Sequence, residues 1–279
     1  MIFGLKYFLP TYKFKNDPMY RNISLHPLLV PYVSEILIQD LDDTETMSSA
    51  YRVFPTPYPV MGFQYRGKLD VIQDNEKVPL SQTGVTGLQT STHWFSQHED
   101  TRTILVKFFP HSLFSMLRHP INEITDRHLG LESFLRLSQL RLFEEQLSEA
   151  KDVEKLESLV QNFLIAHIQT TTAMTSDVLE DATRRILATH GRIRIELLAQ
   201  DYNISRRQLE RHFQFYAGMS PKDFASLVRF NWSVGHMPNY GSHTELALAA
   251  GYSDQAHLSR HFMRYAGLTP NQFRKMASE

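Results

Sequence analysis

The stretch "SDQAHLSRHFMRYAGLTPNQF" at residues 253–273 decides the fold of the C-terminal third, because a near copy of it occurs upstream. The copy, "RRQLERHFQFYAGMSPKDF", occupies residues 206–224. With an offset of 49 residues (Leu258 minus Leu209), segments 206–224 and 255–273 are identical at nine of 19 positions. A duplicated structural unit is therefore expected at this end of the chain.

The identical residues divide into a buried group and an exposed one. Each copy has a leucine and a phenylalanine four residues apart, which share one helix face and are expected in the core. A further identity, Arg211 in the first copy and Arg260 in the second, lies two residues beyond the leucine and off that face. The apolar matches are explained by a duplicated helical fold alone. A repeated exposed arginine on the second helix of a helix-turn-helix is, in addition, what major-groove recognition uses.

Local signals predict two helix-turn-helix units, at about 195–215 and 244–264. In the first unit Asn203 suits a tight turn, and Ser205 followed by Gln208 has the pattern of a capping box. In both copies a glycine ends the second helix, and a Ser-Pro or Thr-Pro pair begins the next one. Two such units in one polypeptide can read two successive major-groove segments about 34 Å apart.

Composition predicts a protein of the cytoplasm. The chain has 279 residues, 42% of them apolar, and no cysteine, which excludes disulfides, thiolate zinc sites and cysteine nucleophiles. No signal-peptide pattern and no apolar run of about 18 residues is present, so no membrane partner is expected. The net charge of −1 is unevenly divided, because residues 178–279 carry 13 Lys+Arg and 9 Asp+Glu, whereas residues 1–177 carry 16 and 21. The basic third is the part expected to face phosphate.

The rest of the chain predicts an α+β protein in which a β-rich N-terminal domain (1–170) is followed by an all-α domain with two helix-turn-helix units (178–279). Strands are expected to about residue 110, and helices over 112–168, including one that starts near Leu131. The helix at 152–168 either packs within its own domain or pairs with its copy in a dimer. Residues 171–177 are expected to link the domains.

Two longer strings carry a family resemblance: "GRIRIELLAQDYNISRRQLERHFQFYAGMSPKDFASLVRF" and "LALAAGYSDQAHLSRHFMRYAGLTPNQFR". Residues 184–276 resemble the DNA-binding domain of AraC/XylS-type bacterial transcriptional regulators. The resemblance covers about a third of the chain, and its second string fixes turn, cap, core and recognition positions together. The N-terminal part, with "HPLLVPYVSEI" at 26–36, is similar to the less common sensor domains of such regulators.

The resemblance implies which residues touch DNA. The residues expected at base edges are Arg207, Glu210, Arg211, Gln255, Ala256, His257, Ser259 and Arg260. Arginine can pair with guanine, glutamine with adenine, and glutamate with the cytosine amino group. The residues and helix N-termini expected at phosphates are Arg206, Ser220, Lys222 and Thr269.

The sequence departs from the family in the helix that joins the two units. Gly235, Pro238 and Gly241 interrupt it, and proline inside a helix costs about 3 kcal/mol, so the helix is expected to stop near Val234. The shortened linker at 234–243 puts the spacing between the two recognition helices in question.

Two clusters in the N-terminal domain have competing interpretations. The histidines at 93, 98, 111 and 119 match no tight ligand spacing, so scattered histidines are favoured over a metal site. An aromatic group either lines a small-molecule pocket or forms the core of the domain. Its members are Tyr51, Phe54, Tyr58, Phe63, Tyr65, Trp94 and Phe95.

The sequence therefore favours a sequence-specific transcriptional regulator without catalytic chemistry. The alternative is an enzyme or a protein-interaction module in the N-terminal domain, tethered to DNA by the C-terminal domain. A DNA-repair methyl acceptor is excluded, because it needs a nucleophilic cysteine. The implied partners are double-stranded DNA, a small-molecule effector at the N-terminal domain, RNA polymerase if the protein activates transcription, and a second copy in a homodimer. No cofactor or metal is expected.

Overall fold

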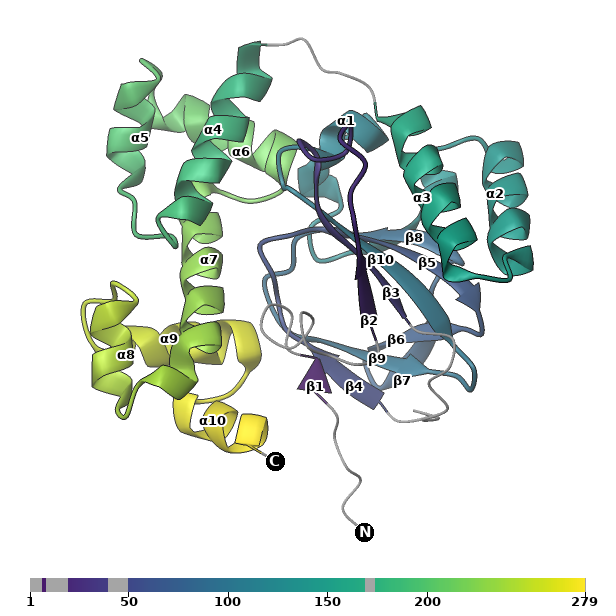
Figure 1. Cartoon of the computed structure of the whole chain (residues 1–279). Coiled ribbons are helices and arrows are strands. Elements are labelled where there is room, and N and C mark those ends of the chain that lie inside the picture. The colour runs from purple at the N-terminus through teal and green to yellow at the C-terminus, as the bar shows by residue number, and fades with distance from the viewer. Residues whose placement is uncertain (1–6, 9–19, 40–49, 169–173, 279) are drawn as a thin grey trace.

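The computed structural model describes residues 7–8, 20–39, 50–168 and 174–278, and shows a β-rich N-terminal domain followed by an all-helical C-terminal domain (Figure 1). The predicted α+β class is confirmed. The described strands are β1 (Tyr7–Phe8), β2 (Tyr20–Ile23), β3 (Val33–Gln39), β4 (Ala50–Val53), β5 (Val60–Arg66), β6 (Leu69–Gln73), β7 (Glu76–Pro79), β8 (Thr83–Thr86), β9 (His93–Gln97), β10 (Arg102–Phe108) and β11 (His128–Gly130). The helices are α1 (Leu113–Leu117), η1 (Ile121–Glu123), η2 (Leu131–Ser133), α2 (Leu137–Glu149), α3 (Val153–His167), α4 (Met174–Ala188), α5 (Ile195–Asp201), α6 (Arg206–Ala217), α7 (Pro221–His236), η3 (Met237–Asn239), α8 (His243–Ala249), α9 (Gln255–Ala266) and α10 (Pro270–Ser278).

The strands form two sheets, and one of them has an apolar face and a mixed face. Among the described strands, the first sheet has the order β1-β4-β9-β6-β7 and the second the order β11-β8-β5-β10-β3-β2. Because side chains alternate along a strand, Met61 and Phe63 of β5 belong to the core beneath α2 and α3, while Gly62 and Gln64 line a cavity on the other face. The second sheet thus supplies both the core of the domain and one wall of the cavity.

Helix α3 packs within its own domain. Leu156, Val160 and Leu164 are fully buried, and the ring of Phe163 lies 5.9 Å from that of Phe63 on the sheet. Asp152 caps the helix by accepting a hydrogen bond from the Lys155 amide, as its position predicts. Of the two alternatives for this helix, packing inside the domain is the one observed.

Three sequence-based boundaries need correction. The helix expected from Leu131 starts at Leu137, because residues 131–133 form a 3₁₀ turn. The stretch expected to be helical from 112 also contains a strand, β11, which pairs with β8. The expected linker 171–177 is partly helical, since α4 already begins at Met174, and its first three residues lie outside the described ranges. These errors share a cause: short apolar segments carry little periodicity, and tertiary pairing decides their state.

The C-terminal domain follows its local signals closely. Asn203 adopts a positive φ of 53°, and Ser205 forms the complete capping box with Gln208 at the start of α6. Gly218 ends α6 with a φ of 93°, and α7 begins at the following Ser-Pro pair. Figure 1 shows α4–α6 at one end of α7 and α8–α10 at the other, so α7 joins two helical units.

The two domains share one apolar cluster. Phe54, which follows β4, and Leu88, which follows β8, are buried among the core residues of the C-terminal domain. The ring centroid of Phe54 lies 5.0 Å from that of Phe273 in α10. The side-chain amide of Asn231 in α7 donates a 3.0 Å hydrogen bond to the carbonyl oxygen of Pro55. The N-terminal domain is therefore packed against the middle of α7 and against α10.

Candidate functional site

Helix α6 exposes two arginines and ties down a third. Arg206 bonds the carboxylates of Glu196 (3.0 Å) and Glu210 (2.9 Å). Two predicted DNA contacts, Arg206 at a phosphate and Glu210 at a base edge, are therefore bonded to each other. Arg207 and Arg211 are exposed. Within the described part of the chain, neither of their guanidinium groups makes a hydrogen bond or an ion pair. The structure thus leaves Arg207 and Arg211 available on this helix.

Helix α9 presents the second set of predicted residues at its N-terminal end. The carboxylate of Asp254 caps the helix by accepting from the His257 amide. The side-chain oxygen of Gln255 accepts from the Thr244 hydroxyl at 3.1 Å, while the hydroxyl of Ser259 donates to the Gln255 carbonyl at 2.9 Å. Ala256 and Arg260 are exposed, and the Arg260 guanidinium has no hydrogen bond or ion pair to any described residue.

The predicted phosphate contacts other than Arg206 lie at the starts of α7 and α10. Ser220 caps α7 and also donates a 2.6 Å hydrogen bond to the Asp223 carboxylate, so this helix N-terminus already carries a negative group. Thr269 accepts from the Gln272 amide at the start of α10. Lys222 is exposed on the first turn of α7. Electrostatically, Lys222 and the start of α10 suit an anion better than Ser220 does.

His212 and His261 occupy equivalent positions in the two copies, and His261 packs within the second unit. The ring of His261 lies 5.0 Å from Tyr252 and 5.8 Å from Tyr265, both edge to face. Burial, and then the charges of His257 and of nearby arginines, lower the pKa of His261 to about 4. Burial also lowers the pKa of its counterpart His212. A neutral ring packed on tyrosines indicates that His261 contributes to the fold of the second unit.

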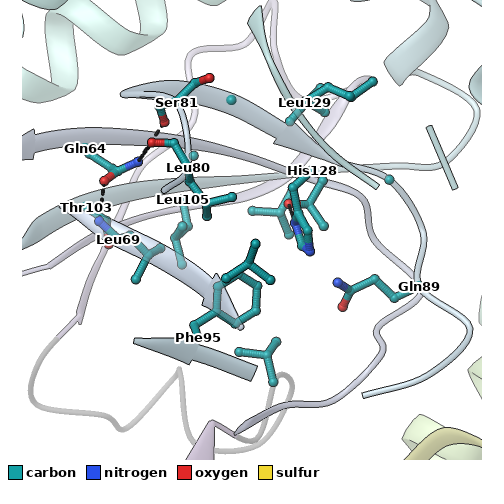
Figure 2. Close-up of a pocket in the computed structure, with 18 of the residues that line it drawn as sticks. Gln64, Leu69, Leu80, Ser81, Gln89, Phe95, Thr103, Leu105, His128 and Leu129 are labelled. Atoms are coloured by element: carbon teal, nitrogen blue, oxygen red, sulfur yellow. Dashed lines mark hydrogen bonds between the residues drawn. The ribbon is translucent and has the colours of Figure 1, made fainter. Parts of the chain in front are cut away.

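A cavity of about 260 Å³ lies between the two sheets of the N-terminal domain (Figure 2). Its lining is mainly apolar and aromatic. Gly62 and Gly84 are directly paired on adjacent strands and bring no side chain into the space, and a Cβ added at Gly62 would meet its nearest neighbour, Leu105, only at 3.8 Å. The aromatic group divides between the two interpretations: Tyr51, Phe54, Tyr58 and Phe95 line the cavity, Tyr65 belongs to the core under α2 and α3, and Phe63 belongs to both.

Most polar groups around the cavity are occupied by neighbours. The amide of Gln64 donates to the Ser81 carbonyl (2.7 Å) and accepts from the Leu69 amide (2.6 Å). Lys107 is ion-paired with Glu35. Gln89 differs: it is 6% exposed, and its side-chain nitrogen has no hydrogen-bond partner among the described residues. Figure 2 shows Gln89, His128 and Phe95 around the same space. A buried donor without a partner is the group that a ligand would satisfy.

His128 makes the stability of the domain depend on pH. Burial lowers the pKa of its imidazole to about 4, and the ring is bonded to Thr86 (2.8 Å) and His93 (2.9 Å). Because the unfolded pKa is near 6.5, this stabilisation is complete above that value and is lost as the pH falls toward 4. We expect the free energy of unfolding to fall by about 1–2 kcal/mol for this residue between pH 7.5 and 5. Urea titrations at the two pH values test this, with His128→Asn as control. An equal pH dependence in this variant would contradict the assignment.

The comparisons with known proteins assign the two parts of the chain separately. Residues 198–276 match the family described as "Helix-turn-helix domain". The C-terminal domain is of the AraC type. Residues 22–130 match the family described as "Domain of unknown function (DUF6597)". The comparison with curated proteins found no match. An AraC-type domain places the chain among DNA-binding transcription regulators.

Solved structures similar to the chain include two of ToxT from Vibrio cholerae. One is 12% identical, covers 82% of this chain and 97% of that chain, and has a TM-score of 0.45. The other, from strain SCE256 and described as bound to unsaturated fatty acid, is 13% identical, covers 83% and 92%, and has a TM-score of 0.43. An AraC-type regulator from Chromobacterium violaceum is 25% identical and covers 38% of this chain and 96% of that chain, with a TM-score of 0.34.

Sequence reasoning missed the residues that hold the two units of the AraC-type domain together. Arg229 of α7 donates to the carbonyl oxygens of Gly191 (2.6 Å) and Gly251 (3.3 Å), which belong to different units. Arg192 donates to the Ala249 carbonyl at 3.2 Å. The helix predicted to stop near Val234 ends two residues later, at His236. These bonds from side chains to backbone carbonyls join the two units, and no local sequence pattern indicates them.

Of the four histidines in question, His93 bonds His128 at 2.9 Å, and the ring of His111 stacks on that of Phe109. His98 is paired with Asp70 (2.8 Å) and His119 with Glu123 (3.0 Å). In the described ranges, no group of three or more His, Asp or Glu side chains is arranged to hold a metal ion. None of the helices described above is both long and apolar enough to cross a bilayer.

Proposed function

We propose that the protein is a transcriptional regulator that reads two successive major-groove segments with α6 and α9, under the control of a small molecule in the N-terminal cavity. The observation that carries the DNA-reading part is the pair Arg211 and Arg260. They occupy equivalent positions on the two helices, both are exposed, and neither guanidinium is engaged by a described residue. An exposed arginine free to form a bidentate contact is the side chain that most often reads guanine.

The neighbouring side chains suit other bases. Gln255, held by Thr244, can pair with adenine, and the methyl group of Ala256 can contact thymine. Glu210 can accept from the cytosine amino group only after Arg206 moves away, so we propose that the two residues part on binding and that Arg206 turns to a phosphate. His257 and Ser259 complete the second set, with Arg207 the further guanidinium of the first.

Phosphate contacts would hold the protein in register. Lys222, the helix N-termini at Ser220 and Thr269, and Arg206 are proposed for this role, which contributes affinity without sequence information. If the protein is an activator, RNA polymerase is a further partner, and a homodimer would place two such domains on one operator.

The cavity supports an uncharged ligand. Its ammonium group, Lys107, is already neutralised by Glu35, and burial keeps the His128 ring neutral at pH 7 because it lowers the pKa of the imidazole. A charged ligand would therefore enter without a counter-charge, which is costly in an apolar site. Because a cavity of about 150 Å³ holds benzene, a cavity of 260 Å³ accommodates roughly ten non-hydrogen atoms. The Gln89 amide would give such a ligand its hydrogen bond.

Selection from a random-sequence DNA pool by the full-length protein, at a stated physiological salt concentration, tests the DNA-reading part. We expect two short motifs whose centres lie about one helical turn, or roughly 34 Å, apart. A single motif would show that only one unit reads bases. Failure to enrich any sequence, in the presence and absence of a library of small neutral molecules, would overturn the proposed function.

A further inference from the structure

The N-terminal domain bonds the C-terminal ends of both α6 and α9. The hydroxyl of Thr125 donates a 2.6 Å hydrogen bond to the carbonyl oxygen of Gly218, the residue that ends α6. The hydroxyl of Thr92 donates a 2.8 Å hydrogen bond to the carbonyl oxygen of Tyr265 in the last turn of α9. Carbonyl groups at the end of a helix lack intrahelical partners, so each threonine supplies a bond that the helix cannot make itself.

The contact at Gly218 depends on close approach. A Cβ at this position would lie 2.7 Å from the Thr125 hydroxyl oxygen and 3.2 Å from Ile121, and the residue has a φ of 93°. At Gly267, the equivalent position after α9, a Cβ would meet nothing within 4 Å. Glycine at 218 therefore serves both the turn and the docking of α6 on the N-terminal domain.

The two threonines belong to one rigid element. The amide and the hydroxyl of Thr90 each donate a 2.6 Å hydrogen bond to the Asp126 carboxylate. The Asp126 amide in turn donates to the Leu88 carbonyl at 3.0 Å. We call Thr92 and Thr125, joined through Thr90 and Asp126, the threonine clamp. It connects the ends of the two helices by a path that does not pass through α7.

The threonine clamp adjoins the cavity wall in sequence. Gln89 stands between Leu88, which is buried in the C-terminal core, and Thr90 of the clamp, and its own side chain lines the cavity. His128, two residues after Asp126 and the first residue of β11, also lines the cavity (Figure 2). A ligand that binds the Gln89 amide therefore acts on a residue with Leu88 of the C-terminal core on one side in sequence and Thr90 of the clamp on the other.

We propose that the threonine clamp sets the distance between α6 and α9, and with it the half-site spacing that the protein accepts, and that filling the cavity changes this setting. The proposal rests on the proposed function, since it assigns regulation to the same two helices and the same cavity. Thr92 and Thr125 are positioning residues in this scheme, because they touch the helices and not the DNA.

A direct distance measurement tests the clamp without DNA. The chain has no cysteine, so Gln214→Cys and Met263→Cys, which are exposed and equivalent on α6 and α9, can carry a single pair of spin labels. We expect one narrow distance distribution in the otherwise unchanged full chain. In the Thr92→Val/Thr125→Val double variant the distribution should broaden. Thr101→Val is the matched control, because the Thr101 hydroxyl bonds carbonyl groups of its own domain. An unchanged distribution in the double variant, or equal broadening in the control, would overturn the role of the clamp.

Transmission from the cavity is tested with Gly62→Leu, which fills part of the cavity with a side chain in place of a ligand. We expect this substitution to shift the mean distance between the labels, and the shift to vanish when both clamp threonines are valine. If Gly62→Leu leaves the distance unchanged while circular dichroism shows an intact fold, transmission from the cavity is ruled out.

The DNA arm uses the site recovered by selection, with one base pair inserted or removed between the motifs, which changes their separation by about 3.4 Å. We expect the unmodified protein to lose about tenfold or more in affinity, and the double valine variant to lose about threefold or less. Equal losses would contradict the clamp as the origin of spacing. Recovery of no two-part site would instead count against the proposed function, while the distance measurement would still decide the clamp.

Discussion

Replacement of Phe54 by alanine is expected to separate the unfolding of the two domains and to remove about 3–5 kcal/mol of stability, the usual cost of truncating a buried phenylalanine. Phe54 is 1% exposed although it extends from its own sheet, because its ring packs on Phe273 in the other domain. Phe273 in turn packs on Phe262 of α9, with ring centroids 5.4 Å apart. Loss of the Phe54 ring therefore weakens both the contact between the domains and the packing of the C-terminal core.

The two tryptophans of the chain make this measurable. Trp94 reports the N-terminal domain and Trp232 the C-terminal domain, so urea titrations of the Trp94→Phe and Trp232→Phe backgrounds follow each domain by fluorescence. We expect coincident transitions in the otherwise unchanged chain, and an earlier Trp232 transition in Phe54→Ala. The matched control is Phe163→Ala, which empties the core of the N-terminal domain and should lower the Trp94 midpoint first. Coincident transitions at an unchanged midpoint in Phe54→Ala would refute the shared core.

The C-terminal domain was predictable because its signals are local. Ser205 with Gln208 marks the start of α6, and Asn203 marks the turn before it, since these residues act on backbone groups within a few positions. The repeat added the prediction that Arg211 and Arg260 are exposed, because both lie off the helix face that carries the core leucine and phenylalanine. The equivalence of Arg211 and Arg260 therefore follows from the amino-acid sequence alone.

The features that join the domains could not be predicted in this way. An apolar residue such as Phe54 has the same sequence pattern whether it packs in the core of its own domain or in that of the neighbouring domain. Only the structure shows that it packs in the C-terminal core. Thr92 and Thr125 lie in polar loops, where a threonine is ordinary, and their partners are 173 and 93 residues away in sequence. Gln89 is recognisable only by what it lacks among the described residues, a partner for its amide, and no sequence pattern signals an absence of that kind.

Replacement of both Arg211 and Arg260 by alanine is expected to remove most sequence-specific DNA binding while leaving binding to random DNA nearly intact. A base-reading arginine is worth about 1–3 kcal/mol, so the double variant should lose roughly 2–6 kcal/mol on the selected site if the two contacts are independent. Both side chains are exposed and have no bond to a described residue, so their removal should cost little stability. Titration of labelled duplexes at several salt concentrations measures the affinity for the selected site and the affinity for random DNA.

Lys222→Ala is the matched control, because Lys222 is exposed but proposed to contact phosphate. It should weaken binding to all sequences alike and lower the slope of log affinity against log salt by about one, whereas the arginine variants should change specificity more than slope. The single variants locate each contact: Arg211→Ala should relax the preference in one motif and Arg260→Ala in the other. Equal losses on selected and random DNA would show that the arginines contact phosphate only. Loss of both motifs in either single variant would contradict the assignment of one motif to each arginine.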